Sequence, residues 1–368
     1  MSRLPELAPR EPRFTHVIGI GGIGTGILIE LKGNATLART ESRMGCVLDA
    51  KDYCKLHIVE HYVAALVHSA TEETTPKVWA VGNVGDDDRG SMLLREMAEV
   101  GIDTRCVRTE AQNRTLFSVS FLYPDKSGGN ITIANSAANA LTRQQIESCR
   151  TELSKAGERG LALCLPEVPL EMRTYFLRIA TDCGNYRVAS FPAGEMADVR
   201  KLNMLSQVDL LAINLEEAAA LAYESQNVRD RVEVLRECAR VAGAANPEIR
   251  ITVSAGGDGV YVFDGGNWRR RPAVQAEVIS TAGAGDALLA GVIAGIVSGL
   301  PLIDDDQGRT DSAIDLGLWV AAFSLTSPHS IHPGFNMQAL RDFARSNPES
   351  NPTVNDLQLE RDAIQTRS

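Results

Sequence analysis

The feature that most constrains this chain is a run of small residues and one acid, Thr281-Ala282-Gly283-Ala284-Gly285-Asp286, directly before the apolar stretch Ala287–Ser298. The apolar stretch predicts a buried helix. Small residues let a backbone approach a phosphate closely, and a helix N-terminus adds unpaired N–H groups and the positive end of its dipole. The run therefore predicts an anion site at the start of a helix. The carboxylate of Asp286 ends this loop, where it can accept a proton from an attacking hydroxyl.

Two further elements point the same way, although each also has a simpler explanation. Asn214 and Glu217 follow the apolar run Asp209–Ile213 and can face a phosphate and Mg²⁺ from the first turn of a helix; alone, they are typical of a capping pair. The segment Ser254-Ala255-Gly256-Gly257-Asp258-Gly259 can hold a nucleotide; alone, it is typical of a hairpin turn. Taken alone, the first run is also explained as a Gly-rich turn with Asp286 as its N-cap.

Strands and helices are expected to alternate along the chain, which predicts an α/β fold with a mainly parallel sheet covered on both faces. Thr115–Tyr123 and Asn130–Ala134 are expected strands with no helix between them, so they predict a local antiparallel lid. Gly82–Gly90 is expected to be a loop, followed by a helix over Ser91–Val100. The other expected strands include His16–Ile20, Lys77–Val81, Leu161–Leu165, Leu210–Ile213 and Arg250–Ser254, and the other expected helices include His57–His68, Glu216–Tyr223 and Asp311–Leu325.

The domain organisation follows from the same reading. Residues 1–14 are expected to form a flexible tail, residues 15–345 one domain, and residues 346–368 a polar C-terminal tail. The lid strands are expected within residues 30–50 and 114–134.

Composition excludes several classes of partner. The net charge of −10 shows no basic surplus, so neither nucleic acid nor an anionic membrane is an expected partner. No apolar run reaches the roughly 18 residues of a membrane helix. The seven Cys are scattered and the first residues lack an apolar signal core, which together predict a cytoplasmic protein. The expected partner is a small molecule.

The three motifs, in this order, resemble the ribokinase-like (PfkB) family of carbohydrate and nucleoside kinases. Gly82-Asn83-Val84-Gly85-Asp86-Asp87 and Ala137-Ala138-Asn139-Ala140-Leu141-Thr142 add to a resemblance that spans roughly residues 15–340. It implies a ribokinase-like three-layer α/β sandwich with a central, mainly parallel sheet and a small β lid. It also implies an ATP-dependent kinase that transfers the γ-phosphoryl group to a hydroxyl of a sugar or sugar-like small molecule, and a homodimer formed through the lid strands.

The resemblance also implies roles for individual residues. Asp286 is the expected catalytic base, and the backbone of Gly283, Ala284 and Gly285 is the expected anion hole. Glu217 is expected to help hold Mg²⁺ indirectly. The expected nucleotide-side and phosphate-side residues are Asn214, Glu217, Ser254, Gly256, Gly259 and Thr281.

Three departures from the family pattern concern the cation and the acceptor. Ser280 stands where the family usually has an Asp, so the sequence does not support a monovalent cation (K⁺) site. Gly21 is followed five residues later by Gly26, where the family has a sugar-binding Asp, and the helix expected to touch the sugar, near Leu56-His57, also departs. We therefore expect an acceptor other than ribose or fructose. The candidate substitutes for the missing contacts are Asn34, His57, His61, Arg114 and Asn139.

Two alternatives remain open from the sequence. The altered sugar side is compatible with a catalytically weak or inactive, ligand-binding member of the same fold. The run Gly19–Gly24 matches GxGxxG after an expected strand, which is typical of a NAD-dependent dehydrogenase, with Glu41 at the distance of the acidic residue that binds ribose.

Overall fold

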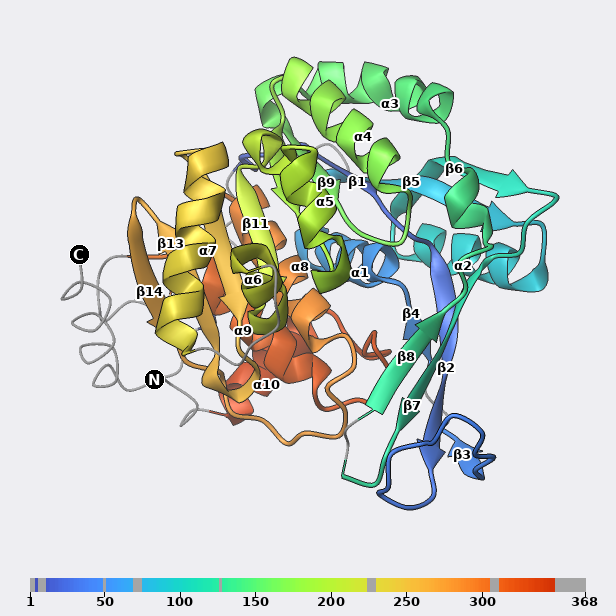
Figure 1. Cartoon of the computed structure of the whole chain (residues 1–368). Helices are drawn as coiled ribbons and strands as arrows, with labels where there is room; N and C mark the ends of the chain where they lie inside the picture. The colour runs from blue at the N-terminus through green and yellow to red at the C-terminus, as the bar shows by residue number, and fades with distance from the viewer. Residues whose placement is uncertain are drawn as a thin grey trace.

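A nine-stranded sheet forms the centre of the protein in a computed structural model, which describes residues 4–5, 11–48, 51–68, 75–125, 128–223, 230–304 and 311–347. The strand order is β14-β13-β12-β11-β10-β9-β1-β5-β6 (Figure 1). Neighbours from β12 to β6 pair in parallel, whereas β13 and β14 are antiparallel. The strands are β1 (His16–Ile20), β5 (Lys77–Gly85), β6 (Ile102–Glu110), β9 (Gly160–Cys164), β10 (Tyr186–Ala189), β11 (Leu210–Asn214), β12 (Arg250–Ser254), β13 (Val260–Asp264) and β14 (Asn267–Arg271).

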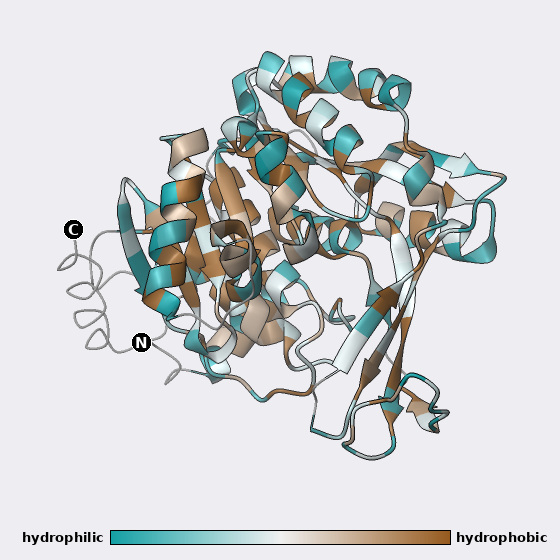
Figure 2. Ribbon diagram, viewed as in Figure 1, coloured by the Kyte–Doolittle hydropathy of each residue, from teal (hydrophilic) through white to brown (hydrophobic). Residues whose placement is uncertain are grey.

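Helices cover both faces of this sheet and give the expected three layers (Figure 1). One apolar core lies between the sheet and α1, α2, α8, α9 and α10, and a second lies between the sheet and α3 to α7. In Figure 2 the apolar residues line these interfaces and the polar residues face outward. The helices are α1 (Lys55–Val67), α2 (Asp88–Glu99), α3 (Arg143–Ala156), α4 (Leu170–Asp182), α5 (Met196–Lys201), α6 (Leu215–Ala222), α7 (Arg231–Ala245), α8 (Ala284–Val297), α9 (Ala313–Ser324) and α10 (Met337–Ser346). None of the helices in the described ranges has both the length and the apolar character that crossing a membrane requires.

A second, five-stranded sheet forms the small β lid beside the large sheet (Figure 1). Its order is β3-β2-β7-β8, with β4 paired to β2. Strands β2 and β7 pair in parallel, and the other pairs are antiparallel. The lid strands are β2 (Gly24–Leu31), β3 (Gly45–Val47), β4 (Asp52–Tyr53), β7 (Leu116–Leu122) and β8 (Gly128–Thr132).

The predicted loop over Gly82–Gly90 is wrong at both ends. Strand β5 continues to Gly85, and α2 begins at Asp88. Buried Asn83 extends the strand because its side-chain oxygen accepts a hydrogen bond from Gln145 at 2.7 Å. Asp87 starts the helix by accepting from the Gly90 N–H at 2.9 Å. The same carboxylate accepts from Thr115 N at 2.9 Å, so it also fixes the start of the lid.

The GxGxxG interpretation of Gly19–Gly24 is also wrong. A dinucleotide site needs a helix after these glycines, because the helix N-terminus binds the pyrophosphate. Strand β2 of the lid begins at Gly24 instead. Glu41 is exposed outside any strand, so the second part of the dinucleotide pattern is also missing.

The expected tails fall largely outside the described residues. Residues 1–3 and 6–10 of the N-terminal tail and residues 348–368 of the C-terminal tail lie there. The division of the chain into tails and one domain therefore stays a prediction.

Candidate active site

The turn before α8 has the geometry that small residues permit. Gly283 is the N-cap of α8 in the left-handed region, with φ of 75°. A Cβ at this position would also lie 2.5 Å from the carbonyl oxygen of Ser330. The helix begins at Ala284 rather than near Ala287, so Asp286 lies inside its first turn. The interpretation of Asp286 as the N-cap is therefore wrong, and its side chain is free for another role.

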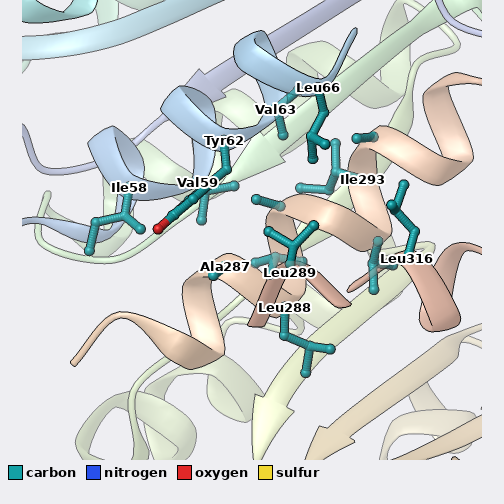
Figure 3. Close-up of a cluster of buried hydrophobic side chains, with 14 of the residues drawn as sticks. Ile58, Val59, Tyr62, Val63, Leu66, Ala287, Leu288, Leu289, Ile293 and Leu316 are labelled. Atoms are coloured by element: carbon teal, nitrogen blue, oxygen red, sulfur yellow. The ribbon is translucent and has the colours of Figure 1, made fainter. Parts of the chain in front are cut away.

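The packing of α1 against α8 brings Asp286 to a basic partner. Figure 3 shows Ile58, Tyr62 and Leu66 of α1 facing Leu289 and Ile293 of α8 in one buried cluster. At the start of the two helices, Lys55 Nζ lies 3.3 Å from Asp286 Oδ1. The side chains are only 22% and 19% exposed, so this ion pair is shielded from most of the solvent.

Burial and this ion pair oppose each other in setting the protonation of the site. Burial raises the pKa of Asp286, and the Lys55 ammonium partly offsets the rise. Burial lowers the pKa of Lys55, but the carboxylates of Asp286 and Glu217 outweigh it, so the pKa of Lys55 is raised overall. The result is a carboxylate of increased basicity held beside a firmly protonated amine.

A cavity of about 230 Å³ lies in front of Asp286, at the carboxyl ends of β11 and β12. Crevices of α/β sheets at this edge are where ligands bind. The cavity is bounded by the α8 turn on one side and by polar side chains on the other. Its polar and glycine lining comprises Lys55, Asn214, Glu217, Thr252, Ser254, Gly283, Gly285 and Asp286.

Asn214 and Glu217 form the capping box that their spacing suggested. Asn214 Oδ1 accepts from Glu217 N at 2.8 Å, and Asn214 N donates to Glu217 Oε2 at 2.8 Å. Burial raises the pKa of Glu217, while Lys55 lowers it. The capping role and the cavity lining coexist, because the bond from Asn214 goes to one carboxylate oxygen of Glu217.

A second cavity, of about 330 Å³ and mainly apolar, adjoins the first. Ser254 and Gly285 line both cavities. Gly259, with φ of 93°, closes the β12–β13 turn at its edge. The residues predicted for the nucleotide side, Ser254, Gly256, Gly259 and Thr281, all line this cavity, as do Ala284 and Gly285, together with apolar residues that include Leu318, Ala322 and Leu325.

The donors around the first cavity fit a magnesium–phosphate ligand. Within the described ranges, no group of three or more His, Cys, Asp or Glu side chains is placed to hold a metal ion by itself. Mg²⁺ commonly uses one or two carboxylates, waters and substrate phosphates instead of a complete protein cage. Glu217, which lines the cavity near Lys55, suits that partial role.

Ser280 uses its hydroxyl inside the loop. Its Oγ accepts a hydrogen bond from the Ala282 N–H at 3.2 Å, and its own N–H donates to the Leu325 carbonyl at 3.3 Å. This segment and the loop after α9 are therefore tied together without a carboxylate at position 280.

Glu167, which follows β9 in the chain, is a second carboxylate that contacts the start of α1. Its backbone is left-handed, with φ of 72°, which is uncommon for a residue with a side chain. Its Oε2 accepts a hydrogen bond from the Lys55 N–H at 3.3 Å. Burial raises the pKa of Glu167 to about 7, although a hydrogen bond from Cys54 opposes the rise.

None of the five predicted acceptor contacts lines either cavity. Asn34, Arg114 and Asn139 are exposed. In α1, His57 is buried and His61 is partly buried. Desolvation lowers their pKa values to about 3 and about 4, so both rings are neutral at pH 7. The geometry gives these five residues no contact with the site around Asp286.

Sequence reasoning missed Lys55 and Glu167. It placed the start of the helix near Leu56-His57, and the structure begins it at Lys55, with Cys54 as the N-cap. A lysine at the first position of an otherwise apolar helix was the available signal. Glu167 had a weaker signal, namely an acid in the short segment after the buried strand β9, between Pro166 and Pro169.

The fold and the cavity together define a ribokinase-like protein, and comparison with known proteins supports this class. The ribokinase of Giardia lamblia superposes with a TM-score of 0.73 at 16% identity, covering 89% of this chain and 99% of that chain. Residues 64–335 match the family described as pfkB family carbohydrate kinase. The chain belongs to this family, and the expected class, a phosphotransferase with an alcohol group as acceptor, is confirmed at the level of the family.

Two curated relatives are more similar to the chain in sequence than this structural neighbour is. The chain is 27% identical over 215 residues to the ATP-dependent ribose-1-phosphate kinase of Halopiger xanaduensis, a match that covers 58% of this chain and 65% of the relative. It is 25% identical over 250 residues to the ribokinase of Haemophilus influenzae, covering 68% and 76% respectively.

Proposed function

We propose that this protein is an ATP-dependent kinase that transfers the γ-phosphoryl group to a hydroxyl of a sugar or sugar-like molecule, with Asp286 as the base. The observation that carries the proposal is the cavity in which Asp286, Lys55 and the glycine turn of α8 meet. A carboxylate of raised pKa takes the proton from the acceptor hydroxyl as the oxygen attacks phosphorus. The phosphoryl group then moves from the donor to this oxygen.

The other groups of the site stabilise the negative charge that is present during phosphoryl transfer. The backbone N–H groups of Gly283, Ala284 and Gly285 lie at the positive end of α8 and stabilise negative charge on the transferred group. The Lys55 ammonium lines the same cavity, adds a positive charge there and favours the ionised form of Asp286. Phosphoryl transfer depends mainly on such positioning and electrostatic stabilisation.

The second cavity is assigned to the nucleotide. Its apolar walls suit a base, while Ser254, Gly256, Gly259 and Thr281 lie along its edge. Asn214 and Glu217 lie at the phosphate end, where Glu217 would hold Mg²⁺, which would neutralise charge on the phosphates. The name of the Halopiger relative includes ATP, which supports this donor. Ser280 offers no carboxylate, so the proposal includes no K⁺ site.

The acceptor enters between the lid and the start of α1, where Glu167 and Lys55 meet. The names of the relatives, a ribose-1-phosphate kinase and a ribokinase, support a hydroxylated sugar as the acceptor in this proposal. The sequence departures at Gly26 and His57 still favour an acceptor other than free ribose or fructose. Efficient phosphorylation of ribose or fructose at low concentration would contradict this part of the proposal.

A catalytically inactive, ligand-binding protein is the second candidate function. The absence of any predicted acceptor contact from the cavities favours it. The complete set of Asp286, Lys55 and glycine turn argues against it, because ligand binding alone needs no base beside an anion site.

The experiment that tests the proposal is a screen of ATP consumption with magnesium against pentoses, hexoses, nucleosides and their monophosphates. The product of each positive reaction is identified by phosphorus NMR. We expect at least one phosphate ester whose formation needs both the acceptor and Mg²⁺. ATP binding without any acceptor-dependent product would favour the binding protein instead.

A further inference from the structure

Asp52 is an acidic side chain of the lid that the chemistry above does not use. It lies in β4, which pairs with β2, and it stands directly opposite Gly26. A Cβ on Gly26 would lie 2.8 Å from Asp52 Oδ2 and would also collide with Ser118 Oγ. Gly26 therefore leaves space on its own strand, and the carboxylate of Asp52 fills that space from the neighbouring strand.

The surroundings of this carboxylate are polar and come from a third strand. Ser120 Oγ of β7 donates a hydrogen bond to Asp52 Oδ2 at 3.3 Å. Ser118, also in β7, faces the same space over Gly26. The Tyr53 N–H and the Ser330 hydroxyl also interact with this carboxylate. A carboxylate has about four acceptor sites, so capacity remains for a donor from a ligand.

The same face of the lid leads to the reaction site. Gly24 and Gly26 alternate along β2, so they present one common face, and Gly22 lies just before this strand. A Cβ on Gly22 would meet Glu167, and a Cβ on Gly24 would lie 2.8 Å from Cys54 Sγ. Glu167, Cys54 and Asp52 therefore follow one another along this face, next to the start of α1, where Lys55 pairs with Asp286.

The pKa of Asp52 is raised overall because the side chain is largely buried. Hydrogen bonds from Ser120, the Tyr53 N–H and Ser330 oppose the rise, and the negative charge of Asp286 makes a small addition to it. A carboxylate so placed gains from donors that satisfy it, because burying an incompletely paired polar group is costly.

We propose that Asp52 is an acceptor-binding, specificity-determining residue that receives hydrogen bonds from neighbouring hydroxyls and so directs another hydroxyl of the same molecule toward Asp286. This inference rests on the proposed kinase function for the identity of the site. It places the contact on β4 and on none of the five residues that sequence reasoning selected.

The proposal also defines the class of acceptor. Asp52, Glu167 and Asp286 lie on the acceptor side, where Lys55 is the basic partner already paired with Asp286. A phosphate on the acceptor would bring a dianion close to these carboxylates. The site therefore favours an uncharged, hydroxyl-rich acceptor over a sugar phosphate.

A purely structural role for Asp52 is the competing explanation. Backbone bonds already join this segment to the loop after α9, since Ser330 N donates to the Lys51 carbonyl at 3.0 Å and Tyr53 N donates to Ser330 Oγ at 3.0 Å. The bond from Ser330 N does not use the Asp52 carboxylate, which itself interacts with the Tyr53 N–H and the Ser330 hydroxyl. In Asp52→Asn the side-chain amide oxygen can still accept from these two donors. That substitution keeps the size of the side chain and removes its charge.

The test measures binding by calorimetry in an Asp286→Asn background saturated with a non-hydrolysable ATP analogue. The probes are D-ribose, D-fructose, uridine and ribose 1-phosphate, and the tightest probe is then compared with its monodeoxy analogues. We expect Asp52→Asn to weaken the tightest probe by about tenfold or more, as the loss of a charge-assisted hydrogen bond implies. One deoxy analogue should lose a similar factor with Asp52 present and almost nothing in the Asp52→Asn protein.

The control is Asp103→Asn, which changes a partly exposed carboxylate at the start of β6 that pairs with Arg105. It should change affinity by less than about twofold. Equal weakening of every deoxy analogue by Asp52→Asn, tightest binding of the sugar phosphate, or no binding by any probe would overturn the proposal. Full turnover by Asp286→Asn would contradict the kinase mechanism alone and would leave the binding result for Asp52 standing.

Discussion

Lys55 Nζ and Asp286 Oδ1 lie 3.3 Å apart, at the first turns of α1 and α8, two helices that are far apart in the sequence. The buried contact between α1 and α8 sets this distance. The packing of the apolar core therefore positions the first turns of α1 and α8. These two turns in turn hold Lys55 beside Asp286, the proposed base.

The charge of Lys55 is predicted to set the pH dependence of turnover. Asp286 must be deprotonated to act as a base, so activity should rise with pH through its pKa. Lys55 lowers that pKa, and its loss in Lys55→Met should move the rising limb to higher pH and reduce kcat. Lys55→Arg should return the rising limb of the pH–rate profile to its original position.

The control for this prediction is Lys51→Met, which removes an exposed amine that pairs with Glu96 and should leave the pH profile unchanged. A rising limb at the same pH in Lys55→Met as in the parent protein would refute the electrostatic coupling between Lys55 and Asp286.

Alanine substitutions at two glycines of the α8 turn are predicted to affect different properties, namely stability in one variant and turnover in the other. Gly283→Ala must adopt a φ of 75° against the Ser330 carbonyl, so it should destabilise the protein by about 1–3 kcal/mol. Gly285→Ala has open space around its Cβ, but that Cβ lies at the cavity. It should keep its thermal midpoint and lose turnover. Denaturant unfolding and kcat, measured on both variants, would separate the two effects, and full activity of Gly285→Ala would argue against the anion hole.

Glu167 is predicted to make stability fall as the pH rises. Its pKa is about 7 in the folded protein and 4.5 in the unfolded chain, so the folded state holds a proton that the unfolded state has released. This contribution is complete below pH 4.5 and is lost as the pH approaches 7. Glu167→Gln should therefore reduce the decrease in thermal midpoint between about pH 5 and about pH 8.

The matched control for this experiment is Glu171→Gln, an exposed glutamate of α4 that pairs with Arg143. It should retain the pH dependence of the parent protein. Identical curves for all three proteins would mean that Glu167 is not protonated near neutral pH.

A homodimer through the lid is predicted from its outer strands. Val47 of β3 and Ile131 of β8 are 69% and 64% exposed, on the two edges of the lid sheet. Exposed apolar edges are normally covered by a partner. Light scattering should show a dimer that Val47→Glu with Ile131→Glu converts to a monomer, whereas Leu202→Glu, outside the lid, should not. A monomeric parent protein would end this prediction.

Local patterns predicted the parts of the site that one segment builds. The glycine turn, the pair Asn214 and Glu217, and the β12–β13 turn lie close to where their sequences indicated, since each depends on neighbours in the chain, although α8 begins earlier than expected, at Ala284. The α/β fold and the lid followed from alternating elements and from the two strands without a helix between them.

Contacts between distant segments were not accessible in this way. Lys55 reaches Asp286 through helix packing, and Asp52 reaches the space over Gly26 through strand pairing. Gly82–Gly90 was assigned to a loop because its composition is typical of one, but the buried bond between Asn83 and Gln145 extends the strand. Contacts between residues far apart in the sequence determine the structure at these positions. The local sequence alone therefore could not predict it.

The central claim, that Asp286 is the base of a phosphoryl transfer at the α8 turn, is tested most directly by Asp286→Asn. The measurement pairs acceptor-dependent kcat with the dissociation constant for ATP–Mg²⁺, using Asp103→Asn as the control. We predict that kcat falls by about 10²–10⁴-fold, as expected for a lost general base, while the affinity for ATP changes little. An Asp286→Asn protein that keeps its kcat would contradict the account.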